Sequence, residues 1–336
     1  MTARRITKLA AGALAAALCA GLAGCEGRLP AVTAADGDQA AAAPDLTAAQ
    51  ERKLRGQILD VIKQADDAKD ASGLAARLTG PSLAVRTSQI AVAQKTGQMD
   101  NKATIPDKIA QTVIPTDSGW PRTVFTITTT TDDQQSNRLL VLTQDSAREN
   151  YKLWGLARLF QGAQLPNFAV PSIGSPMGTP KDAGLVATPE QAVERYADVL
   201  AKGDQSEFAA DFADDDLRRT LAEQSAKVQQ AMEANAGTQE QTFQVAPGQL
   251  KVMRSADGSD LVVAEIDSVW TRAAGEGRES LPASDAETAL FGGGQATSTM
   301  KVTYVNIIAL VVPPKDSGLK ITAVGAERQP VKVEAV

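Results

Sequence analysis

The chain has 336 residues, of which 43% are hydrophobic and 22% charged, and its formal net charge is −6. This composition is typical of a globular protein that can bury hydrophobic cores, and the length suggests two domains. The acidic balance argues against nucleic acid as a partner. The sequence contains no histidine, which excludes Ser-His-Asp and Cys-His catalysis and histidine-ligated metal sites within it.

Residues 1–24 are predicted to be a signal peptide. Basic residues precede the apolar run Leu9–Ala23, which is shorter than the about 20 residues that a membrane-spanning helix needs. The run ends in Leu-Ala-Gly-Cys, which resembles the lipobox of bacterial lipoproteins. The resemblance implies cleavage between Gly24 and Cys25 and diacylation of the Cys25 sulfur. An ordinary signal peptide with a chance cysteine is the alternative.

The segment that follows is predicted to be a tether. Cys19 would be removed with the signal peptide, so the mature chain would keep one cysteine and no internal disulfide. Residues 25–45 are rich in Ala, Gly, Asp and Pro and lack the apolar bulk needed to order themselves. We therefore expect a protein anchored at the outer face of the cytoplasmic membrane, facing the periplasm if the host has an outer membrane.

Two similar helix starts lie far apart in the remaining chain. Thr47 and Gln50 have the spacing of a capping box, in which each side chain bonds a free backbone N–H. Thr188 and Gln191 repeat this spacing, with Pro189 at the favoured first helical position. An apolar face of helical period follows each start. The pattern indicates an internal repeat.

The repeat continues beyond these helices. DASGLAARLTGPSLAVRT from Asp70 parallels DQSEFAADFADDDLRRT from Asp204, which sets Leu78 opposite Phe212. A further helix is expected in each half, over residues 82–94 and residues 215–234. Strands rich in β-branched residues follow in matching order. The pairs are 123–131 with 262–270, 138–145 with 306–313, and 151–159 with 319–327.

Each half therefore predicts three helices followed by three or four antiparallel strands. We expect one domain over residues 46–165 and another over residues 188–333. The Pro-rich segment 166–187 is predicted to be a semi-rigid linker. Its apolar side chains, which are Phe168, Val170 and Ile173, suggest that it lies partly against a domain.

Helices packed on a curved antiparallel sheet form an α+β domain. The element order and its repetition over nearly all of the mature chain resemble two NTF2-like or cystatin-like modules in tandem. The Ala-rich, paired-domain chain is also similar to uncharacterised lipoproteins of high-GC Gram-positive (actinobacterial-type) bacteria, a resemblance that brings no activity. NTF2-like sheets curve around a pocket, and enzymes of that superfamily usually place Asp with His, or Tyr with Asp, there. Without histidine, no such role is carried over.

Carboxylates offer two candidate sites. Glu265 and Asp267 alternate on a predicted strand and share a face, which suits general acid–base work in glycoside cleavage. A solvated strand face fits the alternation better. The run Asp214–Asp216 suggests calcium, but no Asp-x-Asp-x-Asp-Gly loop follows it, and a helix start explains it better. We therefore expect no metal site.

Aromatic and glycine residues offer the remaining candidates. Gly292–Gly294 lies in a long predicted loop without the context of a phosphate-binding loop. Beside it, Leu290 and Phe291, with Gly292, are a candidate exposed tip for binding a partner. The large aromatic residues near the strands either line a ligand pocket or belong to the core. They are Trp120, Trp154, Trp270 and Tyr304.

The leading hypothesis is a non-catalytic envelope lipoprotein that acts as a binding or scaffolding module. Its expected partners are the membrane, through the lipid anchor, and an envelope protein or a small apolar ligand, with no cofactor. A carrier of a small apolar molecule is the alternative and requires a cavity of at least about 300 Å³. A carboxylate-dependent hydrolase of envelope polysaccharide is the third hypothesis.

Overall fold

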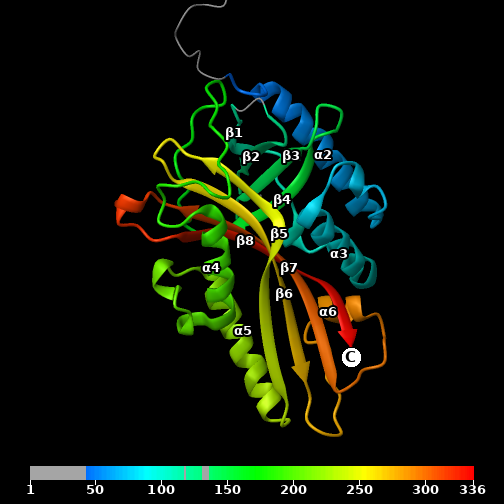
Figure 1. Ribbon diagram of the computed structural model, residues 1–336. Coiled ribbons are helices and arrows are strands. Elements are labelled where there is room, and N and C mark those ends of the chain that lie inside the picture. The colour runs from blue at the N-terminus through cyan, green and yellow to red at the C-terminus, as the bar shows by residue number, and fades with distance from the viewer. Residues whose placement is uncertain (1–42, 117–118, 131–135) are drawn as a thin grey trace, which may run out of the picture. The chain divides into compact units, whose positions relative to one another are not determined.

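The computed structural model describes residues 43–116, 119–130 and 136–336, and Figure 1 shows their arrangement. Helices and antiparallel strands form a mixed α+β fold. The helices are α2 (Ala48–Ala68), α3 (Gly80–Thr96), α4 (Pro189–Lys202), α5 (Asp216–Glu233) and α6 (Asp285–Phe291). The strands are β1 (Ile109–Val113), β2 (Arg122–Thr128), β3 (Arg138–Gln144), β4 (Lys152–Leu159), β5 (Thr238–Arg254), β6 (Asp260–Ala273), β7 (Thr299–Val312) and β8 (Thr322–Ala335).

The strands of both halves form one curled eight-stranded sheet in the order β1-β2-β3-β4-β8-β7-β6-β5. Each half supplies a four-stranded meander, and the meanders meet through their last strands. β4 and β8 pair antiparallel at Arg158 with Ala326 and at Leu159 with Gly325. A Cβ atom at Gly325 would lie 2.7 Å from the Arg158 carbonyl oxygen, so glycine permits this close approach.

The predicted repeat of elements is confirmed. A helix, a short 3-10 segment, a second helix and four strands occur in this order in both halves, and the second half adds α6 between β6 and β7. Both predicted capping boxes are present, at Thr47 and at Thr188. After the 3-10 segments η1 (Leu74–Ala76) and η4 (Ala209–Asp211), the matched residues Leu78 and Phe212 make equivalent bridges. Leu78 pairs with Leu153, and Phe212 pairs with Ile321.

The middle helix predicted in each half is a single 3-10 turn instead. The chain must leave the first helix, return as an extended bridge and enter the next helix within about a dozen residues. Leu153 N donates to the Arg77 carbonyl at 2.8 Å, and Ile321 N donates to that of Asp211 at 3.0 Å. These bridges use backbone groups that a longer helix would bond internally.

Three clusters of buried side chains hold the sheet and helices together. Ile58 and Ile62 of α2 pack with Val124 and Leu140 of the first meander. Val193 and Tyr196 of α4 pack in the same way with Val262 and Ile308 of the second meander. A central cluster draws on both meanders and includes Phe125, Val141, Trp154, Val263, Ile307 and Val324. The two halves therefore share a core as well as a sheet.

The linker 166–187 contacts the sheet at both of its edges. The prediction was only that it would be semi-rigid and lie partly against a domain. Ser175 N donates to the Ile114 carbonyl beside β1 at 2.9 Å, and Gly178 N donates to the Val252 carbonyl of β5 at 3.1 Å. Phe168 packs against the central cluster, whereas Val170 and Ile173 are exposed. Covered edges protect a sheet from pairing with other chains. The predicted domain boundaries at 46–165 and 188–333 stay a prediction.

The predicted signal peptide, Gly24, Cys25 and most of the tether lie outside the described residues. The last predicted tether residue, Asp45, is attached to the fold: its N–H donates to the Pro115 carbonyl at 2.8 Å, and its carboxylate lies 3.4 Å from the Arg122 Nε. Within residues 43–116, 119–130 and 136–336, no helix combines the length and apolar character needed to cross a membrane.

Candidate functional site: two cavities flanking helix α5

Helix α5 is only lightly packed onto the long strands of the second half. Asp215 caps its start and accepts a hydrogen bond from Arg218 N at 2.9 Å. Of its own side chains only Leu217 and Leu221 are buried. The rest of the helix leaves space on both sides, and Figure 1 shows α5 and α6 flanking strands β5 to β8. We name the two spaces the α4–α5 cavity and the α5–α6 cavity.

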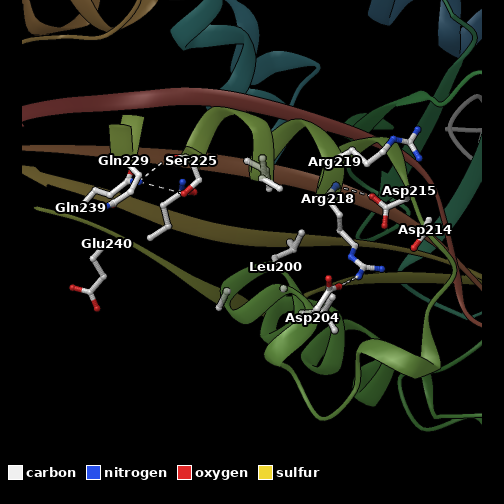
Figure 2. A pocket seen from close by; sticks show the side chains of 16 residues that line it. Leu200, Asp204, Asp214, Asp215, Arg218, Arg219, Ser225, Gln229, Gln239 and Glu240 are labelled. Carbon is white, nitrogen blue, oxygen red and sulfur yellow. Dashed lines mark hydrogen bonds and ion pairs between the residues drawn. The ribbon is translucent and has the colours of Figure 1, made fainter. Parts of the chain in front are cut away.

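The α4–α5 cavity has a volume of about 600 Å³ and is shown in Figure 2. Asp204, Asp214, Arg218 and Arg219 line one end, and Gln229, Gln239 and Glu240 line the other. Arg218 Nη2 lies 3.6 Å from Asp204 Oδ1, and Arg219 contacts Asp216. Both arginines at this end therefore already have carboxylate partners, which leaves no unpaired cation there for an anionic ligand.

Asp214 and Asp215 line this cavity, and the run Asp214–Asp216 marks the start of α5, as the simpler interpretation predicted. Asp215 also accepts a hydrogen bond from the Tyr196 hydroxyl at 3.0 Å. Burial raises the pKa values of both Asp215 and Tyr196. Within the part of the chain that the structure describes, no group of acidic or cysteine side chains has the geometry of a metal site.

The α5–α6 cavity has a volume of about 520 Å³. Its wall includes Trp270 and Tyr304, two of the aromatic residues that were candidates for a ligand pocket. Trp270 of β6 and Tyr304 of β7 lie side by side in a small apolar cluster with Met300, Val302 and Val333. Trp270 Nε1 donates to Gln239 Oε1 at 2.8 Å. The Tyr304 hydroxyl donates to Glu287 Oε1 at 2.9 Å. Both polar ends are therefore satisfied, and the rings present apolar surface to the cavity.

A buried carboxylate attaches α6 to the sheet. Glu287 of α6 forms an ion pair with Arg272 of β6, and both side chains are almost completely buried. Glu287 also accepts from the Tyr304 hydroxyl and from Ala283 N, the latter at 2.7 Å. Ser284 caps the helix by accepting from Glu287 N. Burial is the main cause of the raised pKa of Tyr304, and the Glu287 charge adds to it.

The prediction that Leu290 and Phe291 form the exposed tip of a flexible loop is wrong, because α6 is attached to the sheet. Leu290 and Phe291 lie at the end of α6 and are half-buried against the cluster of Trp270 and Tyr304. Gly292 is exposed and ends the helix in the left-handed conformation with φ of 65°, which glycine adopts readily. Binding of a partner by these three residues stays a prediction.

Arg328 of β8 is one of the cationic residues that line the α5–α6 cavity. Its guanidinium carbon lies 3.7 Å from the centroid of the Tyr304 ring. Its Nη1 donates to Asn306 Oδ1 at 2.6 Å and to Ser268 Oγ at 2.8 Å. Its Nη2 is buried and has no hydrogen-bond partner among the described residues. Burial lowers the pKa of Arg328 to about 10, because the charged form loses solvation.

Further cations surround the cavity. Arg158 lies on its wall and pairs with the buried Glu327, with 2.8 Å between Nε and Oε2. Lys102 and Lys227 line the cavity and are exposed at its rim. The acidic residues on the wall, Asp216 and Glu287, already pair with Arg219 and Arg272. The cavity is therefore locally cationic in a chain whose net charge is −6.

The other predicted candidates lie away from this cavity. Trp154 is buried in the central core, and its Nε1 donates to Gln249 Oε1 at 2.7 Å. Trp120 is exposed. Glu265 and Asp267 lie on the face of β6 opposite the buried Val262, Ala264, Ile266 and Trp270, as the simpler interpretation predicted, but they are half-buried and not fully solvated. Burial and then the Asp267 charge raise the pKa of Glu265 to about 7, and burial also raises that of Asp267.

Replacement of Glu265 by glutamine is expected to change how stability depends on pH. A carboxyl group whose pKa rises on folding binds its proton more tightly in the folded state, so its ionisation destabilises the fold as pH rises from about 4.5 to about 7. Glu265→Gln should therefore be more stable than the natural chain at pH 8, by about 1 kcal/mol after allowance for solvent screening. The difference should vanish near pH 4.5.

Urea unfolding of both proteins at pH 4.5 and pH 8 measures this difference. Asp260, whose pKa burial raises to about 6, titrates in the same range but is common to both proteins and cancels in the comparison. Exposed Glu149→Gln is the matched control and should show no difference at either pH. A variant no more stable than the natural chain at pH 8 would contradict the assigned pKa of Glu265.

The residues around Arg328 were not found by sequence reasoning, although a signal for them exists. Along β6 the core-facing series Val262, Ala264, Ile266 and Trp270 also includes Ser268 and Arg272, both buried. Along β7 the buried Asn306 likewise interrupts an apolar series. Polar residues at core positions of a strand indicate a buried polar network, which is costly unless satisfied. Buried polar residues within the apolar series of two adjacent strands therefore predict a polar site between these strands.

Comparison with known proteins gives one match. A family model described as "Domain of unknown function (DUF8094)" matches residues 31–332, and so it spans both halves and the strands around Arg328. No curated protein and no solved structure matches the chain. Since the match covers nearly all of the sequence, the chain belongs to the DUF8094 family.

Proposed function

We propose that this protein is a lipid-anchored extracytoplasmic module that binds a small molecule in the α5–α6 cavity without transforming it. The observation that carries the proposal is the cavity itself. Its volume of about 520 Å³ lies within the range of ligand pockets, about 300–1,000 Å³. Its wall combines the Trp270 and Tyr304 rings with polar and charged side chains, so it offers both apolar surface and groups that can orient a ligand.

The state of the polar groups favours binding over catalysis. Glu287 accepts from Arg272, from Tyr304 and from Ala283 N, so its lone pairs are engaged. The Tyr304 hydroxyl is a donor in that network, and its pKa is raised, so it is a poor base. Ser284 caps α6. A nucleophile next to a free base, the usual requirement for covalent or acid–base catalysis, is absent from the described wall of the cavity.

The wall of this cavity belongs mostly to the second of two proposed NTF2-like or cystatin-like units, and Lys102 and Arg158 of the first half complete it. The repeated order of helix, 3-10 turn, helix and four strands supports this interpretation, as do the equivalent bridges at Leu78 and Phe212. The anchoring part of the proposal rests on the sequence around Cys25. Scaffolding of an envelope protein, through Leu290, Phe291 and Gly292, is the second candidate, and the half-burial of Leu290 and Phe291 makes it the weaker one.

Native mass spectrometry of the full chain, purified from the cells that make it, tests the proposal. We expect a defined mass increase from a bound small molecule. Thr220→Trp, which places an indole ring in the α5–α6 cavity, should abolish the increase. Ala222→Trp, on the same helix but lining the α4–α5 cavity, should keep it. An increase that survives Thr220→Trp, or is lost equally in both variants, would contradict the assignment to this cavity.

A further inference from the structure

Arg328 is a half-buried cation that forms no ion pair of its own with the carboxylates on the described wall of the α5–α6 cavity. Both groups that accept from its Nη1, the Asn306 amide oxygen and the Ser268 hydroxyl, are neutral. The nearest acidic group in the cavity, Glu287, is already paired with Arg272. Charges that lose part of their hydration are usually paired, because removal of an ion from water is costly. An anionic group from a ligand would therefore be favourable next to Arg328.

The surroundings of Arg328 hold its guanidinium in one orientation. The ring of Tyr304 stacks on it with the guanidinium carbon 3.7 Å from the ring centroid. Asn306 is itself fixed, since its Nδ2 donates to the Ile266 carbonyl at 2.6 Å and to Ser268 Oγ at 3.1 Å. A guanidinium has five N–H donors in a rigid planar fork that matches the oxygens of carboxylate and phosphate. Its Nη2 has no partner among the described residues.

The rest of the cavity indicates what would accompany the anionic group. Trp270, Tyr304 and Leu221 offer aromatic and aliphatic surface next to Arg328. Lys102 and Lys227 stand exposed at the rim, where cations attract anions toward an opening and raise their rate of association. A ligand that matches all of these features has one anionic head and one apolar or aromatic body.

From this arrangement we infer that the α5–α6 cavity binds a small amphipathic anion, a carboxylate or phosphate monoester with an apolar body, whose head pairs with Arg328. This inference rests on the proposed binding function and names the class of its ligand. It differs from the carrier of an apolar molecule expected from the sequence, for which a half-buried cation without a carboxylate partner beside the ligand would be unfavourable. Arg328 acts here as a binding residue and not as a catalytic one.

Two fluorescent probes that differ by one charged group test the inference. These are 8-anilinonaphthalene-1-sulfonate, which is anionic, and N-phenyl-1-naphthylamine, which has the same rings without the sulfonate. We expect the full chain to bind the sulfonate saturably and at least about tenfold more tightly than the amine, the typical contribution of a charge-assisted hydrogen bond. Binding of the sulfonate, but not of the amine, should weaken as salt rises.

Variants of Arg328 assign the preference to this residue. Arg328→Met should lose the preference for the sulfonate, whereas Arg328→Lys, which keeps the charge without the planar fork, should keep part of it. Arg195→Met is the matched control, because Arg195 pairs with Asp211 away from this cavity, and it should bind both probes as the natural chain does. Near-ultraviolet circular dichroism checks that each variant keeps its tertiary packing.

The rim lysines provide a test that does not depend on the folding of an Arg328 variant. Lys102→Met and Lys227→Met alter exposed side chains and should each weaken sulfonate binding about two- to threefold at low salt, with no effect on the amine. Displacement of the sulfonate by octanoate or by octyl phosphate then distinguishes a carboxylate ligand from a phosphate ligand. Octanol, which has the apolar body alone, should displace little.

The outcomes separate this inference from the proposed function. Equal binding of both probes by the natural chain, unchanged in Arg328→Met, would overturn the anionic ligand and leave a module that binds apolar molecules. Displacement by octanol as effective as by octanoate would have the same meaning. The absence of saturable binding of either probe, together with a mass unaffected by Thr220→Trp, would overturn the proposed binding function itself.

Discussion

Glu287→Ala is expected to lower the free energy of unfolding by about 3–5 kcal/mol, the typical cost of removing one partner from a buried ion pair. The variant leaves the Arg272 guanidinium, buried on β6, without its carboxylate. It also removes the acceptor of the Tyr304 hydroxyl and of Ala283 N, and a buried donor left unpaired adds its own penalty. Urea unfolding followed by circular dichroism measures the change.

A double variant separates the cost of a lone charge from the value of the pair. Arg272→Met with Glu287→Leu replaces both charges by apolar side chains of similar size, a change that is often neutral or stabilising for buried pairs. We expect it to recover much of the stability lost in Glu287→Ala. The exposed pair of Lys63 and Asp67, with Nζ and Oδ2 2.6 Å apart, is the control. Asp67→Ala should change stability by less than about 1 kcal/mol.

A cost below about 1 kcal/mol for Glu287→Ala would show that α6 is not attached as described. Loss of this attachment should also appear locally, because Leu290 and Phe291 pack against the cluster of Trp270 and Tyr304 only while α6 is in place. Hydrogen exchange of the α6 amides should accelerate in Glu287→Ala more than in the double variant. Urea unfolding therefore reports on the contribution of the Arg272–Glu287 pair to the whole fold, and hydrogen exchange reports on its contribution at α6.

The repeated helices and strands could be predicted because local signals specify them. The capping boxes at Thr47 and Thr188 depend on residues three apart, and the apolar faces that follow depend on residues within a few turns. The start of α5 at Asp215 was predicted for the same reason. Such signals act within one element and do not require knowledge of what it packs against.

The arrangement of the two halves could not be predicted in this way, because it depends on contacts between distant residues. The joining of the meanders rests on two pairs, Arg158 with Ala326 and Leu159 with Gly325, and no local pattern marks them. β5 is a long strand in which only Val252 and Met253, near its end, are buried. Its sequence therefore lacks the alternation of apolar and polar residues that predicts a half-buried strand. Its partner β6 holds it in place along most of its length.

The candidate site was predicted in part. Trp270 and Tyr304 were candidates because large aromatic residues near strands often line pockets, and both line the α5–α6 cavity. Arg328 and Glu287 were missed because their roles arise only where β8 and α6 meet β6 and β7. A charged residue near the end of a chain normally predicts exposure. The partners Asn306 and Ser268, which are far from Arg328 in sequence, hold its half-buried side chain at the cavity.

Cys25→Ala is expected to move the protein from the membrane fraction to the soluble fraction. A diacylated cysteine places two hydrocarbon chains in the bilayer at about 0.8 kcal/mol per buried methylene, which gives stable anchoring, whereas the apolar run Leu9–Ala23 is too short to span it. Without the sulfur at residue 25 no acyl group can be attached at this position. Fractionation of cells and labelling with an alkyne-bearing fatty acid measure both consequences.

The other cysteine supplies the matched control. Cys19→Ala removes a thiol from the same apolar run but leaves the Leu-Ala-Gly-Cys motif intact, so it should leave both membrane association and labelling unchanged. Labelling that persists in Cys25→Ala would contradict the lipobox interpretation. A natural chain found unlabelled in the soluble fraction would instead indicate an ordinary signal peptide. In that case the α5–α6 cavity would belong to a protein without this lipid anchor.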